Sequence, residues 1–320
     1  MKFTKKALAG SVAAVCAFGA ASNAFAEIEL GEGLSVTGFV DMSYWYEDID
    51  GADSSTKEFG IDQVEMDFMW AGSEGISAQI DVQYGASAEG GELAETTFIE
   101  QAFITKQFSD EFSVKVGRFL AYSGWEAAEP TGLYQYSASP MGVFYGGYQQ
   151  GISAYYDAGT VDLMFSVVND VTNGFEDDTQ NLDIEAGVAF EPTEGWVAKL
   201  FYLTDDEDTT IDFWTSYETG GFTFAFEYGM TDFDDDSESS GILLMGNYAT
   251  GAFGITLRYH DLTMEDAAGN ESDTSGITLA PSYAIGDNLL IVAEYRMDEW
   301  GDDDFDGESD LFAIEALFTF

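Results

Sequence analysis

The chain has 320 residues, of which 60 are Asp or Glu and only 10 are Lys or Arg, so its formal net charge is −50. This excess of acid excludes nucleic acid as a partner, because phosphate contacts need Lys and Arg. It does not indicate disorder, because 46% of the residues are hydrophobic and they follow a regular pattern. Frequent glycine (35 residues) and scarce proline (4 residues) are typical of a β-rich chain with many turns.

Residues 1–26 predict a cleaved secretory signal peptide. "MKFTKK" is a basic start, "ALAGSVAAVCAFGAASN" is an apolar stretch rich in small residues, and "AFA" places alanines ahead of Glu27. Cleavage there removes three bases, leaves seven against sixty acids, and brings the net charge to −53. The one cysteine, Cys16, lies inside the signal, so the mature chain has neither disulfides nor thiolate chemistry.

Apolar and polar residues alternate throughout the mature chain. In "ISAQIDVQY" every second residue from Ile76 is apolar, and "FTFAFEYG", "FGITLRYH" and the final "SDLFAIEALFTF" repeat the pattern. A period of two indicates a β-strand with one apolar face, and none of these windows has the spacing of an amphipathic helix. We predict sixteen strands, approximately at residues 34–46, 59–71, 75–86, 96–108, 111–119, 148–157, 160–169, 180–191, 195–204, 209–219, 221–231, 240–249, 252–264, 274–285, 288–298 and 309–320.

The connections are of two kinds that alternate along the chain. Tight turns such as "GSEG", "PTEG" and "IGDN" are followed by long acidic loops such as "EDIDGADSSTKE" and "DFDDDSES". Short turns on one side and long loops on the other are typical of bacterial outer-membrane barrels, whose strand number is even. We therefore predict an all-β fold, in which residues 27–320 form a single transmembrane antiparallel up-and-down β-barrel with short periplasmic turns and long extracellular loops. A large secreted β-sandwich or β-helix is the soluble alternative, but sandwiches do not segregate turn lengths in this way.

The last strand predicts how the barrel closes. Its lipid-facing row includes Phe318 and ends on Phe320. Pairing with the strand around "LSVTGFVDMSYW" would remove both sheet edges, which hydrocarbon does not tolerate. A terminal Phe after alternating apolar residues also resembles the signal that the outer-membrane assembly machinery reads. We expect Phe318 and Phe320 to form this assembly signal, with that machinery, outer-membrane lipid and lipopolysaccharide as partners.

From "GLSVTGFVDMSYWY" to "FAIEALFTF" the chain resembles Gram-negative general porins, and in particular the Putative beta-barrel porin-2 group. The strongest local match is "FSVKVGRF", which porins of this type place before their pore-constricting third loop. The resemblance implies sixteen strands, a diffusion pore in the outer membrane and often a homotrimer.

Residues suited to catalysis or metal binding are few. His260 is the only histidine, we expect it to line the lumen, and no local motif singles out a serine partner, so we predict neither an enzyme nor a cofactor. "DDDFDGESD" holds Asp302, Asp304 and Asp306 in the first half of a calcium-loop pattern, but the twelfth position is Ala313 instead of glutamate. We expect a solvated acidic loop with at most weak binding of Ca²⁺ or Mg²⁺.

The polar faces of the strands carry the expectation for transport. A Lys or Arg facing lipid at the midplane would cost about 2–4 kcal/mol, so the alternation should turn charged residues toward water. Acids outnumber bases on these faces, and acids along a pore favour cations, although plain solubilising lining is the alternative for any single residue. The residues expected to line the pore are Glu65, Asp67, Asp81, Asp183, Glu185, Lys199, Glu227 and Arg296, and the same faces hold Asp212, Glu294 and Glu315.

The longest connection, residues 121–147, differs from the other long loops. It has only Glu126 and Glu129 among many aromatic and small residues. A loop this long is usually functional, and its aromatic content favours an inward fold against the barrel wall. The resemblance to porins implies a constriction loop at about 120–147, with both glutamates facing basic wall residues. The expected constriction residues are Glu126, Glu129, Lys115, Arg118 and Arg258. A cap outside the mouth, a contact with a neighbouring subunit and an outward-facing Arg118 are the alternatives.

The sequence therefore predicts a passive outer-membrane channel for small hydrophilic solutes and ions, with a preference for cations. Two alternatives stay open. One is a substrate-specific channel, for example for sugars, that uses aromatic residues of the lumen and loops. The other is a structural or adhesion barrel that conducts nothing.

Overall fold

The computed structural model describes residues 28–51, 55–89, 92–126, 128–172, 182–205, 207–302 and 306–320. The predicted signal peptide lies outside these residues. Within them, seventeen strands form one antiparallel sheet, and two short 3-10 helices, η1 (Pro130–Gly132) and η2 (Pro140–Phe144), interrupt the longest connection. None of the helices in these ranges is long and apolar enough to span a membrane.

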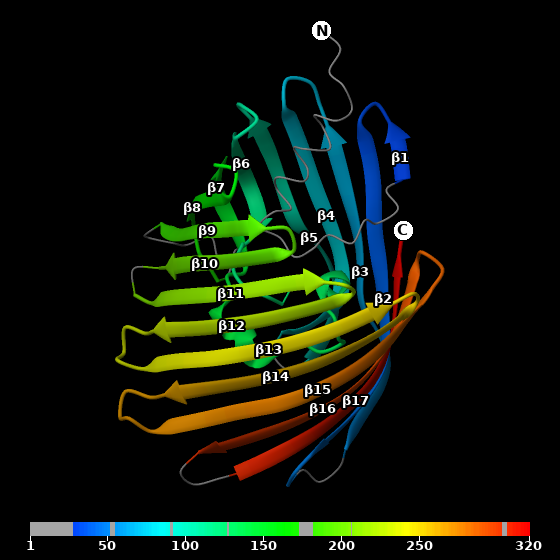
Figure 1. The fold of residues 1–320 in the computed structure, drawn as a ribbon, viewed down its shortest axis with the longest axis vertical. Coiled ribbons are helices and arrows are strands. Elements are labelled where there is room, and N and C mark those ends of the chain that lie inside the picture. Colours follow the sequence, from blue (N-terminus) through cyan, green and yellow to red (C-terminus); the bar gives the residue numbers. More distant parts are fainter. Residues whose placement is uncertain are drawn as a thin grey trace.

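Sixteen of the strands form a closed barrel (Figure 1), because each pairs with its neighbours in sequence and the last pairs with the first. The barrel strands are β2 (Leu34–Ile49), β3 (Thr56–Ala71), β4 (Ile76–Glu89), β5 (Glu92–Gln107), β6 (Phe112–Leu120), β7 (Tyr148–Asp157), β8 (Val161–Val168), β9 (Asp183–Thr193), β10 (Trp196–Thr204), β11 (Thr209–Thr219), β12 (Phe222–Asp232), β13 (Glu238–Thr250), β14 (Phe253–Glu265), β15 (Glu271–Ile285), β16 (Leu289–Asp302) and β17 (Asp306–Thr319). The predicted all-β barrel of sixteen strands is confirmed.

The observed strands depart from the predicted ones mainly at their loop ends. β5 begins at Glu92 instead of 96, and β16 ends at Asp302 instead of 298. These extensions continue past the apolar band that meets lipid, so alternation no longer marks them. The additional strand β1 (Ile28–Gly31) pairs with the start of β2 and was not predicted, because four exposed residues are too few to show a period.

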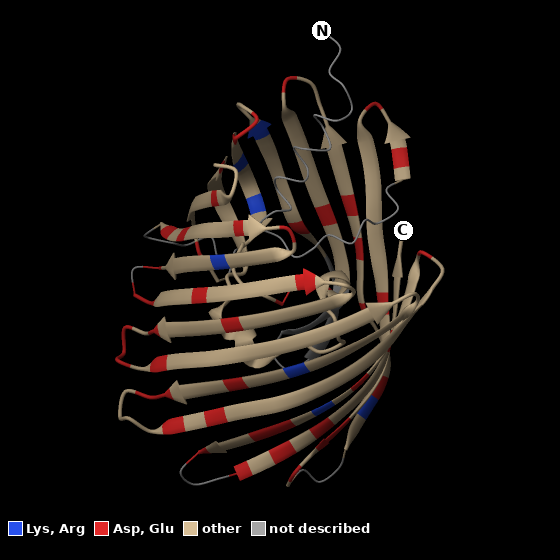
Figure 2. Ribbon diagram, viewed as in Figure 1, with Lys and Arg blue, Asp and Glu red and all other residues tan. Residues whose placement is uncertain are grey.

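The two faces of the sheet have opposite character. On β14, the outward Phe253, Ile255 and Leu257 are exposed, whereas Thr256 and Arg258 at the alternate positions are fully buried on the lumen side. Apolar outside and polar inside is what a barrel in hydrocarbon requires. Figure 2 shows acidic residues in the connections between β10 and β11, β12 and β13, and β14 and β15, at the end of the barrel opposite the tight turns.

The tight turns use residues that tolerate left-handed backbone. Between β11 and β12 the turn consists of Gly220 and Gly221, with φ of 58° and 84°. A two-residue hairpin of this kind needs positive φ at both positions, which glycine adopts without steric cost. The turn therefore fixes the register of these two strands.

The last residue completes the closing ladder. The amide of Phe320 donates to the carbonyl of Gly38 and the amide of Gly38 donates back, both at 3.0 Å. The Thr37 hydroxyl donates to the Phe320 carbonyl at 2.9 Å, and the Phe320 ring lies 6.3 Å from that of Phe318. A Cβ at residue 38 would lie 2.9 Å from the Phe320 ring and 2.2 Å from the Glu65 carbonyl oxygen, so glycine makes room for the chain end.

Deletion of Phe320 should impair assembly, because it removes both ladder hydrogen bonds to Gly38 at the seam of the barrel. The expected result is a severalfold lower yield of heat-modifiable protein in the outer-membrane fraction, with unchanged single-channel conductance for the molecules that insert. Phe222→Ala, which removes an exposed ring from β12 far from the seam, is the control. A normal yield from the deletion variant would show that the last residue is dispensable.

Candidate functional site

The connection between β6 and β7, residues 121–147, folds into the barrel, and we call it the inner loop. Its two helices lie behind β11–β13 in Figure 1, and η2 contacts β11, β12, β13 and β14. The loop leaves and rejoins the wall at one point, because the Ala121 amide donates to the Gly147 carbonyl at 2.9 Å. An inward fold of this segment therefore places its side chains and its backbone in the lumen.

Carboxylates of the wall accept hydrogen bonds from backbone amides of the inner loop. The pairs are Tyr122 with Glu185 (2.8 Å), Gly124 with Asp212 (2.7 Å), Trp125 with Glu227 (2.7 Å), and Tyr136 and Ser137 with Glu294 (2.8 and 3.1 Å). The four acids stand on β9, β11, β12 and β16. All four are buried, so each amide–carboxylate bond is shielded from competing water.

This arrangement corrects the expectation that the acids of the polar face are turned toward water. Glu185 and Glu227 point into the barrel, as the alternation predicts, but the inner loop covers them and both are fully buried. Period-two alternation identifies the face of a strand that a side chain occupies. It carries no information on what lies over that face.

Glu126 and Arg258 join the inner loop to β14. Arg258 Nη1 lies 2.5 Å from Glu126 Oε1, and both side chains are buried. The same guanidinium donates to the Ser137 carbonyl at 2.6 Å. Glu126 also accepts from the Ser139 amide at 2.6 Å and from the Gln135 side chain at 2.7 Å. The pair is thus the centre of a network that holds the two halves of the loop together.

Glu129 does not meet the basic partner that the sequence predicts. Its carboxylate accepts from Gln63 Nε2 at 2.8 Å and from the Tyr148 hydroxyl at 2.9 Å. Glu65 and Glu100 lie beside it, with carboxylate oxygens within 4.8 Å of one another and of Glu129. Burial, and then the charge of Glu100, raises the pKa of Glu129 to about 8.

The other two expected bases lie against aromatic rings. The Lys115 ammonium lies over the Phe103, Phe119 and Tyr122 rings, at 4.6, 5.2 and 4.9 Å from their centroids. Arg118 lies 5.9 Å from the ring centroid of Tyr148 and interacts electrostatically with Glu100. Cation–π contacts of this kind favour a charged amine or guanidinium in a partly dry site.

The remaining expected lining residues have varied partners. The ammonium of Lys199 lies 4.7 Å from the Trp214 ring, Arg296 pairs with Asp298 at 2.7 Å, and Asp183 accepts from the Val171 amide at 3.0 Å. Glu65 and Asp67 stand on β3 and Asp81 stands on β4, and of these three Glu65 lies beside Glu129 of the inner loop.

Two further expectations concern isolated residues. His260 is fully buried on the lumen face, and its Nε2 lies 3.3 Å from Asp298. Of the acidic loop with the partial calcium pattern, Asp302 ends β16 and Asp306 begins β17, whereas Asp304 lies outside the described residues.

Glycines of the wall make space for the inner loop, and the sequence reasoning missed them. Phe144 and Met141 of η2 pack against an apolar patch that includes Leu243. A Cβ at Gly229 of β12 would lie 2.3 Å from the Phe144 ring, and one at Gly241 of β13 would lie 2.8 Å from Met141 Sδ. The available signal was glycine on the polar face inside two otherwise regular strands, which marks a close approach.

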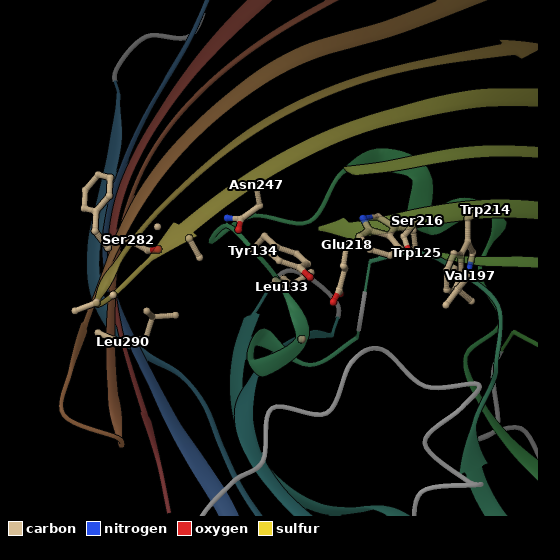
Figure 3. Close-up of a pocket in the computed structure, with 18 of the residues that line it drawn as sticks. Trp125, Leu133, Tyr134, Val197, Trp214, Ser216, Glu218, Asn247, Ser282 and Leu290 are labelled. Carbon is tan, nitrogen blue, oxygen red and sulfur yellow. The ribbon is translucent and has the colours of Figure 1, made fainter. Parts of the chain in front are cut away.

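An aromatic cavity of about 460 Å³ adjoins the inner loop (Figure 3). Trp125 stacks on Tyr134 with centroids 6.2 Å apart, and meets the edge of Trp214 at 5.3 Å. Polar groups from the wall, among them Glu218 and Asn247, share the same cavity. The combination offers apolar ring faces together with hydrogen-bonding groups.

Comparisons with known proteins agree with this architecture. Residues 33–320 match the pattern of the Putative beta-barrel porin-2, OmpL-like family. No curated protein sequence matches significantly.

Solved structures with a similar fold include Salmonella typhi OmpF in complex with daunomycin, with 14% identity, a TM-score of 0.70, and coverage of 92% of this chain and 100% of that one. The trimer form of OmpT of Vibrio cholerae has 13% identity and a TM-score of 0.63, over 90% and 100% of the chains. An anion-selective porin from Comamonas acidovorans has 14% identity and a TM-score of 0.62, over 90% and 99%. Identities this low establish the likeness of fold alone.

Gly229→Ala should dislodge η2, because the new methyl group would occupy the space of the Phe144 ring. We expect a loss of about 1–3 kcal/mol in the free energy of unfolding, as for an overpacked core, and a larger single-channel conductance as the loop moves. Gly246→Ala is the matched control, because its Cβ would meet nothing closer than 3.8 Å. Equal behaviour of the two variants would mean that Gly229 does not seat the loop.

Replacement of one partner of the Glu126–Arg258 pair should cost more than replacement of both. Arg258→Met or Glu126→Gln leaves a buried charge without its partner, which costs about 3–5 kcal/mol of stability. The double variant should recover a large part of this loss in urea unfolding of the detergent-folded protein. Lys57→Met, an exposed change on β3, serves as the control. Additive single losses in the double variant would contradict the coupling.

Proposed function

The chain belongs to the Putative beta-barrel porin-2, OmpL-like family and is therefore an outer-membrane porin-like channel and not an enzyme; from this premise we propose that it passes small hydrophilic solutes and ions passively, with a preference for cations. The observation that carries the preference is the imbalance of charge in the lumen. Arg258 is paired with Glu126 and Arg296 with Asp298. Among the residues that the structure describes, Glu65 and Glu100 form no ion pair with Lys or Arg.

The fold itself does not decide selectivity, since the anion-selective porin from Comamonas acidovorans has the same architecture. The sign of the field along the path must come from side chains. Acids exceed bases in the connections at one mouth of this barrel, for example at Asp234, Asp235 and Asp236 between β12 and β13. Such a mouth raises the local concentration of cations before they reach the lumen.

The proposed constriction is the inner loop, residues 121–147. Its support is the breadth of its attachment, because hydrogen bonds join it to strands that are six apart in the closed order of the barrel. Tyr136 contacts Ser43 of β2 at 3.1 Å, whereas Trp125 donates to Glu227 of β12. A segment fixed at both places supports a narrowing of the solute path at this loop.

Assembly and location complete the proposal. We infer that residues 1–26 direct export to the periplasm, that Phe318 and Phe320 present the carboxy-terminal end to the assembly machinery, and that lipid and lipopolysaccharide surround the inserted barrel. A homotrimer is the expected state, as in the trimer form of OmpT of Vibrio cholerae. The exposed apolar residues on the outer face of the strands offer surface for lipid and for a neighbouring barrel.

A second candidate is a channel with a preferred solute, and the aromatic cavity favours it. The rings of Trp125, Tyr134 and Trp214 lie beside the inner loop, together with the polar Asn247 and Glu218. Sugars present an apolar ring face and hydroxyl groups on the edge, which this lining would satisfy. Saturable block of the current by a sugar would favour this candidate over a general pore.

Planar-bilayer recordings of the purified protein test the proposed function. We expect large ohmic steps and a reversal potential of cation-selective sign under a KCl gradient. The selectivity should weaken as salt rises, because the Debye length falls to about 3 Å at 1 M. An anion-selective sign at low salt would overturn the preference for cations, and absence of any conductance would point to a structural barrel.

A further inference from the structure

Five carboxyl groups gather in the lumen beside the inner loop, and we call them the carboxylate cluster. They are Glu65 and Asp67 of β3, Asp81 of β4, Glu100 of β5 and Glu129 of the inner loop. Oxygens of Glu65, Glu100 and Glu129 lie within 4.8 Å of one another, and so do oxygens of Glu65, Asp67 and Asp81. Glu65 is shared, so the two groups form one continuous cluster.

The carboxylate cluster lacks the cations that balance acids elsewhere in the lumen. Asp67 and Asp81 are directly opposite each other in the strand register, a placement that destabilises a sheet when both side chains carry like charge. None of the five acids forms an ion pair with Lys or Arg in the described residues, although Arg118 acts electrostatically on Glu100. Their hydrogen-bond donors are neutral: Gln63 donates to Glu65 and Glu129, and Gln101 donates to Asp81.

Glu100 provides a second, separate observation. It is only 3% exposed, and its Oε2 accepts no hydrogen bond. The register between β4 and β5 shifts at this point, since Asp81 pairs with Gln101 and Val82 pairs with Ile99, so Glu100 is the extra residue of a β-bulge. A bulge re-aims a side chain at the expense of regular pairing. This bulge brings a buried oxygen without a hydrogen-bond donor into the cluster.

We propose that Glu65, Glu100 and Glu129 bind a Ca²⁺ ion that ties the inner loop to the barrel wall. The ligand set consists of carboxylate oxygens, which hard divalent cations prefer. Oxygens that share one Ca²⁺ lie about 2.3–2.6 Å from it and so no more than about 5 Å from one another, which the separations within 4.8 Å satisfy. Mg²⁺ demands near-ideal octahedral geometry and keeps several waters, a poor match to three carboxylates drawn from two strands and a loop.

The proposed ion explains why Glu129 is held beside Glu65 and Glu100, with no ion pair to a Lys or Arg among the described residues. Gln63 and Tyr148 orient its carboxylate toward Glu65 and Glu100, a geometry that brings three acids together and that a bound cation would stabilise. Asp67 and Asp81, joined to the site through Glu65, supply further negative charge. The site is distinct from the acidic segment of Asp302 and Asp306, which begins and ends strands at the barrel rim.

Calorimetric titration of Ca²⁺ into the purified mature protein tests the proposal. The protein is first folded in detergent and freed of metal with EDTA, which is then removed. We expect one saturable site. Glu100→Gln combined with Glu129→Gln should weaken binding at least tenfold, because it removes two ligands without changing side-chain size. Asp234→Asn combined with Asp235→Asn, in the exposed connection between β12 and β13, should leave the site intact. Heat-modifiability confirms that each variant is folded.

Terbium, which replaces Ca²⁺ and is excited through nearby tyrosine, locates the ion. The Tyr148 hydroxyl is 2.9 Å from the Glu129 carboxylate, so Tyr148→Phe should reduce the terbium emission severalfold. If the double variant does not fold, Glu129→Gln alone carries the test, because that residue lies outside the sheet. No saturable site in the wild-type protein, full binding in the Glu100/Glu129 variant, or equal loss in the Asp234/Asp235 variant would overturn the proposal. None of these readouts depends on conductance.

Discussion

The structure depends on hydrogen bonds between backbone amides of the inner loop and carboxylates of the wall. A loop with little regular structure cannot satisfy its own N–H groups, and a buried N–H group without a partner costs about as much as a lost hydrogen bond. Glu185, Asp212 and Glu227 supply acceptors at successive points of the path from Tyr122 to Trp125. Part of the acid in the lumen is therefore structural, since it gives a segment of the chain a fixed course through the barrel.

Packing supports the same course. Gly229 and Gly241 leave hollows in β12 and β13 that Phe144 and Met141 fill, and Trp125 stacks on Tyr134 and meets Trp214 edge-on. These contacts give the barrel a small internal core, although its large apolar surface faces outward. Polar anchors fix the backbone, and apolar contacts fill the space between loop and wall. The loop is held by both, so its position follows from the wall sequence as much as from its own.

The sequence predicted most of the fold because a membrane barrel imposes period-two alternation on every strand. The run from Phe312 to Phe320 shows this most clearly, and its pairing with β2 closes the barrel. The inner loop stands out by composition alone. The wall residues that contact the inner loop could not be predicted. Alternation defines the face of the sheet that a side chain occupies, but neither its depth of burial nor the residues beside it. The bulge that turns Glu100 inward and the neutral partners of Glu129 arise from register and tertiary contact, which no local pattern encodes.

Acids of the same polar face thus have two different environments. Glu227 accepts from the Trp125 amide and the Tyr145 hydroxyl, so its oxygens are used by the loop. Glu100 has an oxygen that nothing donates to, although it is just as deeply buried. The first kind of acid holds the inner loop in place, and the second kind leaves a carboxylate oxygen open to a cation or a proton. Counting acids therefore overstates the field that a passing ion meets, because backbone amides already offset part of the charge of the acids that hold the loop. For that reason, the acidic connections at the mouth contribute more directly to selectivity than the amide-bound carboxylates inside.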